Sequence, residues 1–172
     1  SGSDQKENNL ITKLKDLGIY IFLKQQESNI DFIKNKYNKK NIHIVRTSAI
    51  KKNNKELQYC VKHNLKIMHR SEVLALIMKQ YNSIAVAGTH GKTTTSTFLA
   101  TLLDLITKDS SSIVGGIVPL YNSNAHIKNS KYLVAEIDES DGTAANYESE
   151  LSIINNIDFD HCDHYSNTKE II

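Results

Sequence analysis

An apolar run that breaks into a glycine-containing loop constrains this chain more than any other feature. Residues 83–87 read Ser-Ile-Ala-Val-Ala, and residues 97–105 return to an apolar pattern with helical spacing. The loop between them contains Gly88, Thr89, His90, Gly91, Lys92, Thr93 and Thr94. This order predicts a strand, a phosphate-binding loop and a helix start, where loop N–H groups and the positive helix end hold an anion. Lys92 would add a mobile positive charge, and a hydroxyl such as that of Thr93 commonly ligates Mg²⁺ in such loops.

The loop is more compact than the usual phosphate-loop pattern. G-x-x-x-x-G-K-[ST] would place its first glycine at Val86, so we expect a variant of that loop. Gly-Lys-Thr also occurs in ordinary solvated loops, and it is the strand before it and the helix after it that favour nucleotide binding. The sequence leaves open whether His90 contacts phosphate or only packs.

Composition and charge exclude several classes of protein. The net charge of the 172 residues is +2 and the lysines are spread along the chain, which predicts no nucleic-acid groove and no membrane-binding patch. Cys60 and Cys162 lie far apart without a C-x-x-C motif, a pattern typical of free thiols in a reducing compartment. No apolar run approaches the roughly 20 residues that span a bilayer. We therefore expect a cytoplasmic protein with no membrane insertion.

The first half of the chain alternates helix-like and strand-like segments, which predicts a parallel α/β unit. We expect helices at residues 9–17, 55–63 and 72–79, and strands at 19–23, 41–45 and 65–68. A boundary near residues 80–83 would divide the chain into domains 1–81 and 82–172. Because the chain starts and stops abruptly, we expect a fragment.

In the second half, polar residues follow segments that are typical of buried strands. Nearly continuous apolar runs predict strands at 132–137 and 151–156, and a shorter one is expected at 112–114. An acidic segment begins at Glu136, and residues 158–164 follow the later run. In an open parallel sheet ligands gather at the carboxyl ends of the strands, so we expect a Mg²⁺ site beside the phosphate loop. Alone, the acidic segment would indicate only a solvated turn.

The histidines and the cysteine of residues 158–164 do not form a zinc pattern. Residues 158–164 hold closely spaced aspartates, histidines and a cysteine, but neighbouring residues cannot readily wrap one tetrahedral ion. A single functional histidine is the better interpretation of this segment. His43, His63 and His69 are expected to be structural or surface groups.

Three motifs in this order resemble the Mur ligase family. They are residues 87–95 (AGTHGKTTT), 134–141 (VAEIDESD) and 156–165 (NIDFDHCDHY). Residues 1–4, 47–50 and 69–74 are similar to motifs of the family's UDP-binding domain, and 115–118 and 123–126 look like its segment facing the muramate sugar. The resemblance implies an α/β fold with a Rossmann-like N-terminal parallel sheet, followed by part of a P-loop NTPase-type central domain.

The resemblance also implies roles for individual residues. Lys92 would hold the β and γ phosphates of ATP, Thr93 would ligate a first Mg²⁺, Glu136 would bridge metal ions, and His161 would ligate a second. The substrate-binding residues implied are Ser48, Arg70, Asn124, Ala125 and Ser140. His126 stands where many relatives carry arginine.

The implied reaction is an ATP-dependent ligation in peptidoglycan precursor synthesis. ATP would phosphorylate the carboxylate of UDP-N-acetylmuramate, and the amine of L-alanine would attack the resulting acyl phosphate. We expect the fragment alone to be inactive, because the family's C-terminal domain helps to bind ATP and the amino acid.

Three alternatives stay open or are weakened by the sequence. A recycling ligase of the same family would attach a whole tripeptide, and the amine specificity depends largely on the C-terminal domain. A non-catalytic nucleotide-binding module would not require both Glu136 and His161. A simple P-loop kinase would not explain the N-terminal α/β unit.

Overall fold

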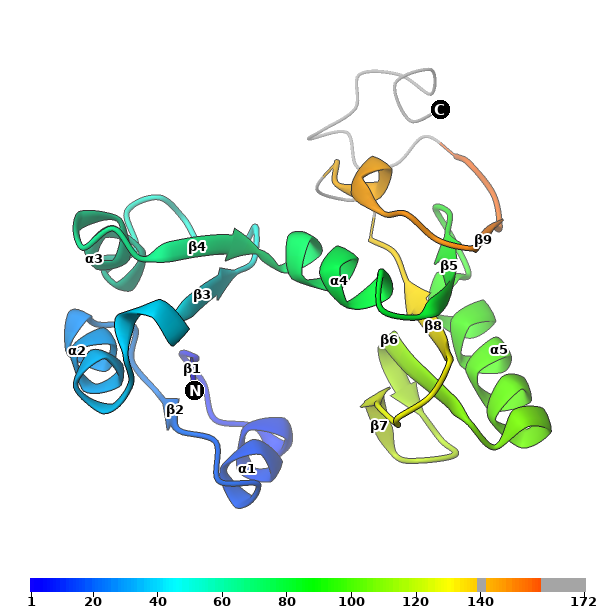
Figure 1. The fold of residues 1–172 in the computed structure, drawn as a ribbon, viewed down its shortest axis with the longest axis horizontal. Helices are drawn as coiled ribbons and strands as arrows, with labels where there is room; N and C mark the ends of the chain where they lie inside the picture. The colour runs from blue at the N-terminus through cyan, green and yellow to red at the C-terminus, as the bar shows by residue number, and fades with distance from the viewer. Residues whose placement is uncertain (139–141, 159–172) are drawn as a thin grey trace. The chain divides into compact units, whose positions relative to one another are not determined.

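The computed structural model describes residues 1–138 and 142–158, and the chain divides into two compact units, Ser1–Arg70 and Ser71–Ile172. Figure 1 shows the helices and strands of both units. The first unit thus ends before the position, near residue 81, at which the sequence places a domain boundary, and that domain division remains a proposal. None of the helices in the described residues is both long and apolar enough to cross a membrane.

Short parallel strands and their connecting helices form the first unit. Its elements are β1 (Gly2–Ser3), α1 (Asn9–Asp16), β2 (Ile21–Phe22), α2 (Glu27–Lys36), the 3-10 turn η1 (Lys39–Asn41), β3 (His43–Arg46), α3 (Lys55–Lys62) and β4 (Lys66–His69). β1 pairs with β2 and β3 pairs with β4, both in parallel. The predicted parallel α/β arrangement is confirmed, although these strands form two separate pairs rather than one continuous sheet.

Local signals explain where the helices of the first unit begin and end. The side chains of Asn8 and Asn54 accept hydrogen bonds from Ile11 N and Leu57 N, which caps α1 and α3. Gly18 follows α1 with a φ of 78°, the left-handed conformation that ends many helices. α2 has no side-chain cap at its start, and the sequence did not predict it.

The core of the first unit gathers around Cys60. Ile30 of α2, Cys60 of α3 and Leu65 form a buried cluster, and Ile44 and Ile67 pack against it. Cys60 is 0% exposed, and its burial, aided by the nearby charge of Glu56, raises the pKa of the thiol from 9.0 to about 11. The thiol is therefore neutral and covered at neutral pH.

This burial predicts a folding-dependent reactivity of Cys60. At pH 8.5 iodoacetamide should label Cys60 at least about tenfold more slowly in the folded chain than in urea, because alkylation requires an exposed thiolate. Peptide mass spectrometry resolves Cys60 from Cys162. Between pH 9 and 11 the unfolded thiol ionises while the folded one stays protonated, so stability should fall as pH rises. A Cys60→Ala variant should lose this component of the pH dependence.

The second unit is built on a single sheet with helices on both faces. Its elements are α4 (Arg70–Met78, with Ser71 the first residue of the unit), β5 (Asn82–Ala87), α5 (Lys92–Thr107), β6 (Ser110–Val118), β7 (Ser123–His126), β8 (Tyr132–Glu136), the 3-10 turn η2 (Ala144–Asn146) and β9 (Leu151–Ile154). The strand order is β7-β6-β8-β5-β9. All neighbours are parallel except β6 and β7, which form an antiparallel pair.

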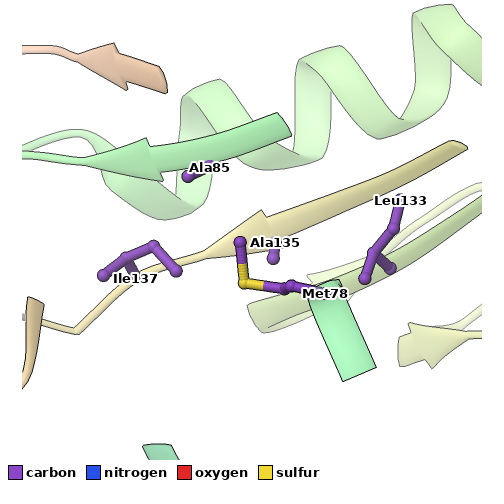
Figure 2. Packing of buried hydrophobic residues seen from close by; sticks show 5 residues of the cluster. All are labelled: Met78, Ala85, Leu133, Ala135 and Ile137. Carbon is purple, nitrogen blue, oxygen red and sulfur yellow. The ribbon is translucent and has the colours of Figure 1, made fainter. Parts of the chain in front are cut away.

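Alternating side chains of the central strands fill two separate cores. Ala85, Leu133 and Ala135 pack with Met78 of α4 and with Ile137, as Figure 2 shows. Val86 and Val134, which are adjacent to these residues along the strands, pack instead with Ala100 of α5. Because successive side chains of a strand point to opposite faces, α4 and α5 cover opposite faces of the sheet.

A matched pair of leucines tests this assignment of the core. Leu133 is 0% exposed and Leu105 of α5 is 62% exposed. Leu133→Ala should lower the free energy of unfolding of the second unit by about 2–5 kcal/mol because it leaves a cavity. Leu105→Ala should change it by less than about 0.5 kcal/mol. Urea unfolding followed by circular dichroism measures both, and equal effects would contradict the assignment.

Candidate phosphate-binding site

The loop between β5 and α5 has a backbone that requires glycine at two positions. Gly88 has a φ of 130° and Gly91 a φ of 77°, values that other residues rarely adopt. A Cβ atom on Gly88 would lie 3.0 Å from the carbonyl oxygen of Asn156. Gly91 is the N-cap of α5 and provides no side-chain cap, as is typical of a helix end that receives an anion.

Lys92 lies across this loop. Its Nζ donates hydrogen bonds to the carbonyl oxygens of Gly88, at 2.7 Å, and of Thr89, at 3.2 Å. The side chain is half-buried. The ammonium group is therefore held over the loop, where a phosphate bound by the α5 amides would meet it. Thr94 lies exposed in the first turn of α5.

Thr93 and Glu136 meet in front of the loop, from two different elements. Thr93 Oγ1 donates a hydrogen bond to Glu136 Oε1 at 2.8 Å, and Gly115 N donates to Glu136 Oε2 at 2.6 Å. Glu136 is the last residue of β8 and Gly115 lies in β6. The hydroxyl and the carboxylate are thus fixed side by side at one edge of the sheet.

The adjacent glycines of β6 make this contact possible. A Cβ on Gly115 would lie 2.8 Å from Glu136 Oε1, and one on Gly116 would lie 2.7 Å from Thr93 Cγ2. The sequence singled out residues 115–118 only for their resemblance to a sugar-facing segment. Their contact with Thr93 and Glu136 was not predicted, and the paired glycines themselves were the only signal for it.

The donor set fits a magnesium ion. Hydroxyl and carboxylate oxygens are the hard ligands that Mg²⁺ takes, usually as one or two protein ligands completed by substrate phosphates and water. Within residues 1–138 and 142–158, no group of three or more histidine, cysteine, aspartate or glutamate side chains could hold a metal ion. An ion here would take Thr93, Glu136 and phosphate oxygens. His161 and Ser140 lie outside the described residues.

Comparison with protein families identifies the chain. Residues 1–82 match the model described as "Mur ligase family, catalytic domain", and residues 86–172 match "Mur ligase middle domain". The chain belongs to the Mur ligase family. The resemblance found in the sequence motifs is confirmed, and the two matches meet between residues 82 and 86.

Individual Mur ligases resemble the chain along its whole length. It is 60% identical over 172 residues to the UDP-N-acetylmuramate–L-alanine ligase of Prochlorococcus marinus subsp. pastoris, covering 100% of this chain and 36% of that protein. The enzyme of the same name from Nostoc sp. is 40% identical, and the chain covers 38% of it. The chain therefore spans little more than a third of the length of these curated relatives.

Two crystal structures share the fold. The UDP-N-acetylmuramate-alanine ligase of Thermotoga maritima matches with a TM-score of 0.82 and 28% identity, over 96% of this chain and 37% of that one. A ligase from Neisseria meningitides that is named for UDP-N-acetylmuramate and L-alanyl-gamma-D-glutamyl-meso-diaminopimelate matches with a TM-score of 0.86 over 99% of this chain and 56% of that one. Its 23% identity carries the fold alone. The predicted α/β fold class is confirmed.

The substrate-binding residues expected of a Mur ligase are distributed over both units. In the first unit, Ser48 Oγ lies 3.0 Å from His69 Nε2, and Arg70 is exposed. In the second unit, Asn124 and Ala125 lie on the edge strand β7. Within the second unit the structure brings Lys92, Thr93 and Glu136 together, and the hydrogen bonds described above for these three residues involve neither Asn124 nor Ala125.

The neighbouring residue His126 is the last residue of β7 and makes an aromatic contact. Its ring stacks on Tyr121, with centroids 4.4 Å apart and planes inclined by 18°. Burial raises the pKa of Tyr121, whose hydroxyl group shares a hydrogen bond with Ser112.

Sequence reasoning missed a set of contacts to the loop from the segment after β9. Asn155 and Asn156 hydrogen-bond to His90 through their side chains, and Thr89 Oγ1 accepts a hydrogen bond from Asp158 N at 2.9 Å. The side chain of His90 itself is exposed. The sequence placed both asparagines in the strand expected at 151–156, whereas β9 ends at Ile154, which leaves their side chains to contact the loop.

The close approach of Gly115 to Glu136 yields a prediction. In Gly115→Ala the added Cβ should displace the flexible Glu136 carboxylate rather than the strand, so Tm should change by only a few degrees. Affinity for ATP in the presence of Mg²⁺ should fall about tenfold, because one metal ligand is out of place. Calorimetric titration measures this, with Ile117→Ala, 58% exposed on the same strand, as control. Unchanged Mg²⁺-ATP affinity would contradict the assigned role.

Proposed function

We propose that this chain forms the UDP-substrate-binding and ATP-binding parts of a cytoplasmic ligase that joins L-alanine to UDP-N-acetylmuramate, with ATP and Mg²⁺. The observation that carries the proposal is the convergence of Lys92, Thr93 and Glu136 where β5 and β8 end. Relatives named UDP-N-acetylmuramate–L-alanine ligase at 40–60% identity support the choice of amine.

The reaction explains why these groups are needed together. A carboxylate is a poor acceptor for an amine, and phosphorylation turns one of its oxygens into a leaving group. ATP would phosphorylate the muramate carboxylate, and the L-alanine amine would then attack the acyl phosphate and release phosphate. Lys92 would neutralise charge on the transferring phosphoryl group, since electrostatic stabilisation is the main help that a protein gives to phosphoryl transfer.

Mg²⁺, when bound, would supply further positive charge to the phosphate oxygens. Thr93 and Glu136 would hold it, and His161 is the proposed ligand of a second ion. Both hydrogen bonds to Glu136, from Thr93 and from Gly115, hold the carboxylate in place before the nucleotide arrives. Such preorganisation lowers the cost of assembling the site.

The muramate substrate would be bound by residues of both parts. We assign Ser48 and Arg70 to its UDP-bearing half, within a substrate domain at residues 1–81. Asn124, Ala125 and Ser140 would contact the sugar side from the ATP-binding domain at 82–172. The chain alone is expected not to catalyse ligation, because it spans little more than a third of its curated relatives.

Release of ADP tests the proposed amine. The complete ligase containing this chain is incubated with ATP, Mg²⁺ and UDP-N-acetylmuramate, and receives either L-alanine or the tripeptide L-Ala-D-Glu-meso-diaminopimelate. Turnover with L-alanine is expected. Turnover with the tripeptide alone would move the assignment to the recycling branch; the Neisseria ligase named for this tripeptide shares the fold of the chain. ATP binding without turnover in either tube would indicate a non-catalytic module.

Substitutions at the site should abolish this turnover. Lys92→Ala and Glu136→Gln should each lower kcat by at least about 100-fold, because each removes charge stabilisation of phosphoryl transfer. Lys131→Ala, which removes an exposed lysine before β8, is the matched control and should leave kcat within twofold. Near-normal ligation by either site variant would refute the assignment.

A further inference from the structure

The phosphate loop is held from one side by two asparagines that lie more than sixty residues later in the chain. We propose that Asn155 and Asn156 are positioning residues that keep the loop in its nucleotide-accepting conformation. This inference deepens the proposed function and rests on it. The two asparagines after β9 would raise the affinity for ATP by holding the loop backbone in place, without contacting ATP themselves.

Asn156 binds both polar groups of one loop residue. Its Oδ1 accepts a hydrogen bond from His90 N at 2.9 Å, and its Nδ2 donates to His90 O at 3.1 Å. One carboxamide thus pairs with the backbone of His90 much as a neighbouring strand would. The orientation of the peptide groups on both sides of His90 is fixed by this pair.

Asn155 links the loop to the helix that follows it. Its Nδ2 donates to His90 O at 3.2 Å and to Thr95 Oγ1 at 3.0 Å. A Cβ on Gly91 would lie 3.2 Å from the same Nδ2. The loop and the first turn of α5 are therefore held to a common side chain at the point where the phosphate-binding amides begin.

Backbone hydrogen bonds also join the loop to the segment after β9. Asn155 N donates to Ala87 O at 3.0 Å, which continues the β5–β9 ladder, and Thr89 N donates to Asn156 O at 3.2 Å. Gly88 lies so close to this segment that a Cβ would be 3.1 Å from the nitrogens of both asparagines. Residues 87–90 thus lie against residues 155–158 as an added strand-like pair.

The loop needs such a partner because of its glycines. Gly88 and Gly91 have the widest backbone freedom in the unfolded and partly ordered states, and a loop that is ordered only on binding loses affinity. When the asparagine contacts form during folding, the loop loses its conformational entropy at that stage, and nucleotide binding no longer has to order it. Asn156 and His90 are exposed, so their hydrogen bonds add little to the global stability and act mainly on the loop.

Hydrogen exchange and ATP binding together test the proposal. In Asn156→Ala the amide of His90 should exchange at least tenfold faster, and the Kd for Mg²⁺-ATP should rise about tenfold, as expected for the loss of two hydrogen bonds. The Tm should stay within a few degrees of the wild-type value, and the Kd for UDP-N-acetylmuramate should stay within twofold of its wild-type value. Both measurements use the complete ligase without any amine, so they do not depend on which amine the enzyme ligates.

Conservative variants separate positioning from a general structural role. Asn156→Asp retains the acceptor for His90 N and should keep that amide protected, whereas Asn156→Ala should not. Thr95→Val removes the hydroxyl that accepts from Asn155 and leaves the other hydrogen bonds of Asn155 in place. It should raise the Kd for ATP about threefold, even if Asn156→Ala proves unstable. Asn82→Ala, at the other end of β5 and exposed, is the control.

The proposal is overturned if Asn156→Ala speeds exchange at His90 but binds ATP like wild type, or if Thr95→Val leaves the Kd for ATP unchanged. It is also overturned if the affinities for ATP and for UDP-N-acetylmuramate fall together with Tm, because that would indicate general destabilisation. If these readouts behave as expected but the complete wild-type ligase does not join L-alanine, only the proposed function is contradicted.

Discussion

The parallel pairing of β5 between β8 and β9 is the constraint on which the site depends. Ile84 pairs with both Val134 and Leu151, and all three strands run in one direction, so their carboxyl ends meet at one edge. The phosphate loop follows β5, residues 155–158 follow β9, and Glu136 is the last residue of β8. Because α4 and α5 cover the two faces of β5 and β8, the register of these two strands is strongly fixed. Functional groups from three distant parts of the sequence are thereby brought to the same end of the sheet.

The site also requires that two backbone segments come very close to their neighbours, and a glycine makes this possible in each case. Gly88 lies against the Asn155–Asn156 backbone, and Gly115 lies against the Glu136 carboxylate. On one side this allows the loop to be held by a neighbouring segment. On the other it lets a backbone N–H donate to the carboxylate. The Thr93–Glu136 pair and the loop are therefore supported by different contacts, so a change at one should leave the other ordered.

Sequence reasoning recovered the elements whose apolar pattern is strong. The strands β5, β8 and β9 and the helices α1, α3 and α4 were expected within a few residues, and the gathering of Lys92, Thr93 and Glu136 was expected from strand direction. The expectation that the strand at 151–156 is buried was wrong, because β9 stands at the end of the strand order with Leu151 and Ile154 exposed. It missed α2, whose start has no side-chain cap and whose apolar residues form only a short cluster. It missed β7 because the sequence Ser-Asn-Ala-His is polar. That strand exists because the chain reverses after β6 and pairs back onto it, a tertiary cause that local propensity does not contain.

The asparagine contacts were beyond prediction for a related reason. Asparagine after a strand is an ordinary turn residue, and its partners, His90 and Thr95, are identified only once β9 is known to lie beside β5. Pairing of this kind lets the end of the sheet act on the loop without adding a charge near the phosphates. A carboxylate in place of Asn156 could still accept from His90 N, but it would repel the nucleotide. A neutral side chain with one donor and one acceptor is therefore the group best suited to order an anion-binding loop from its edge.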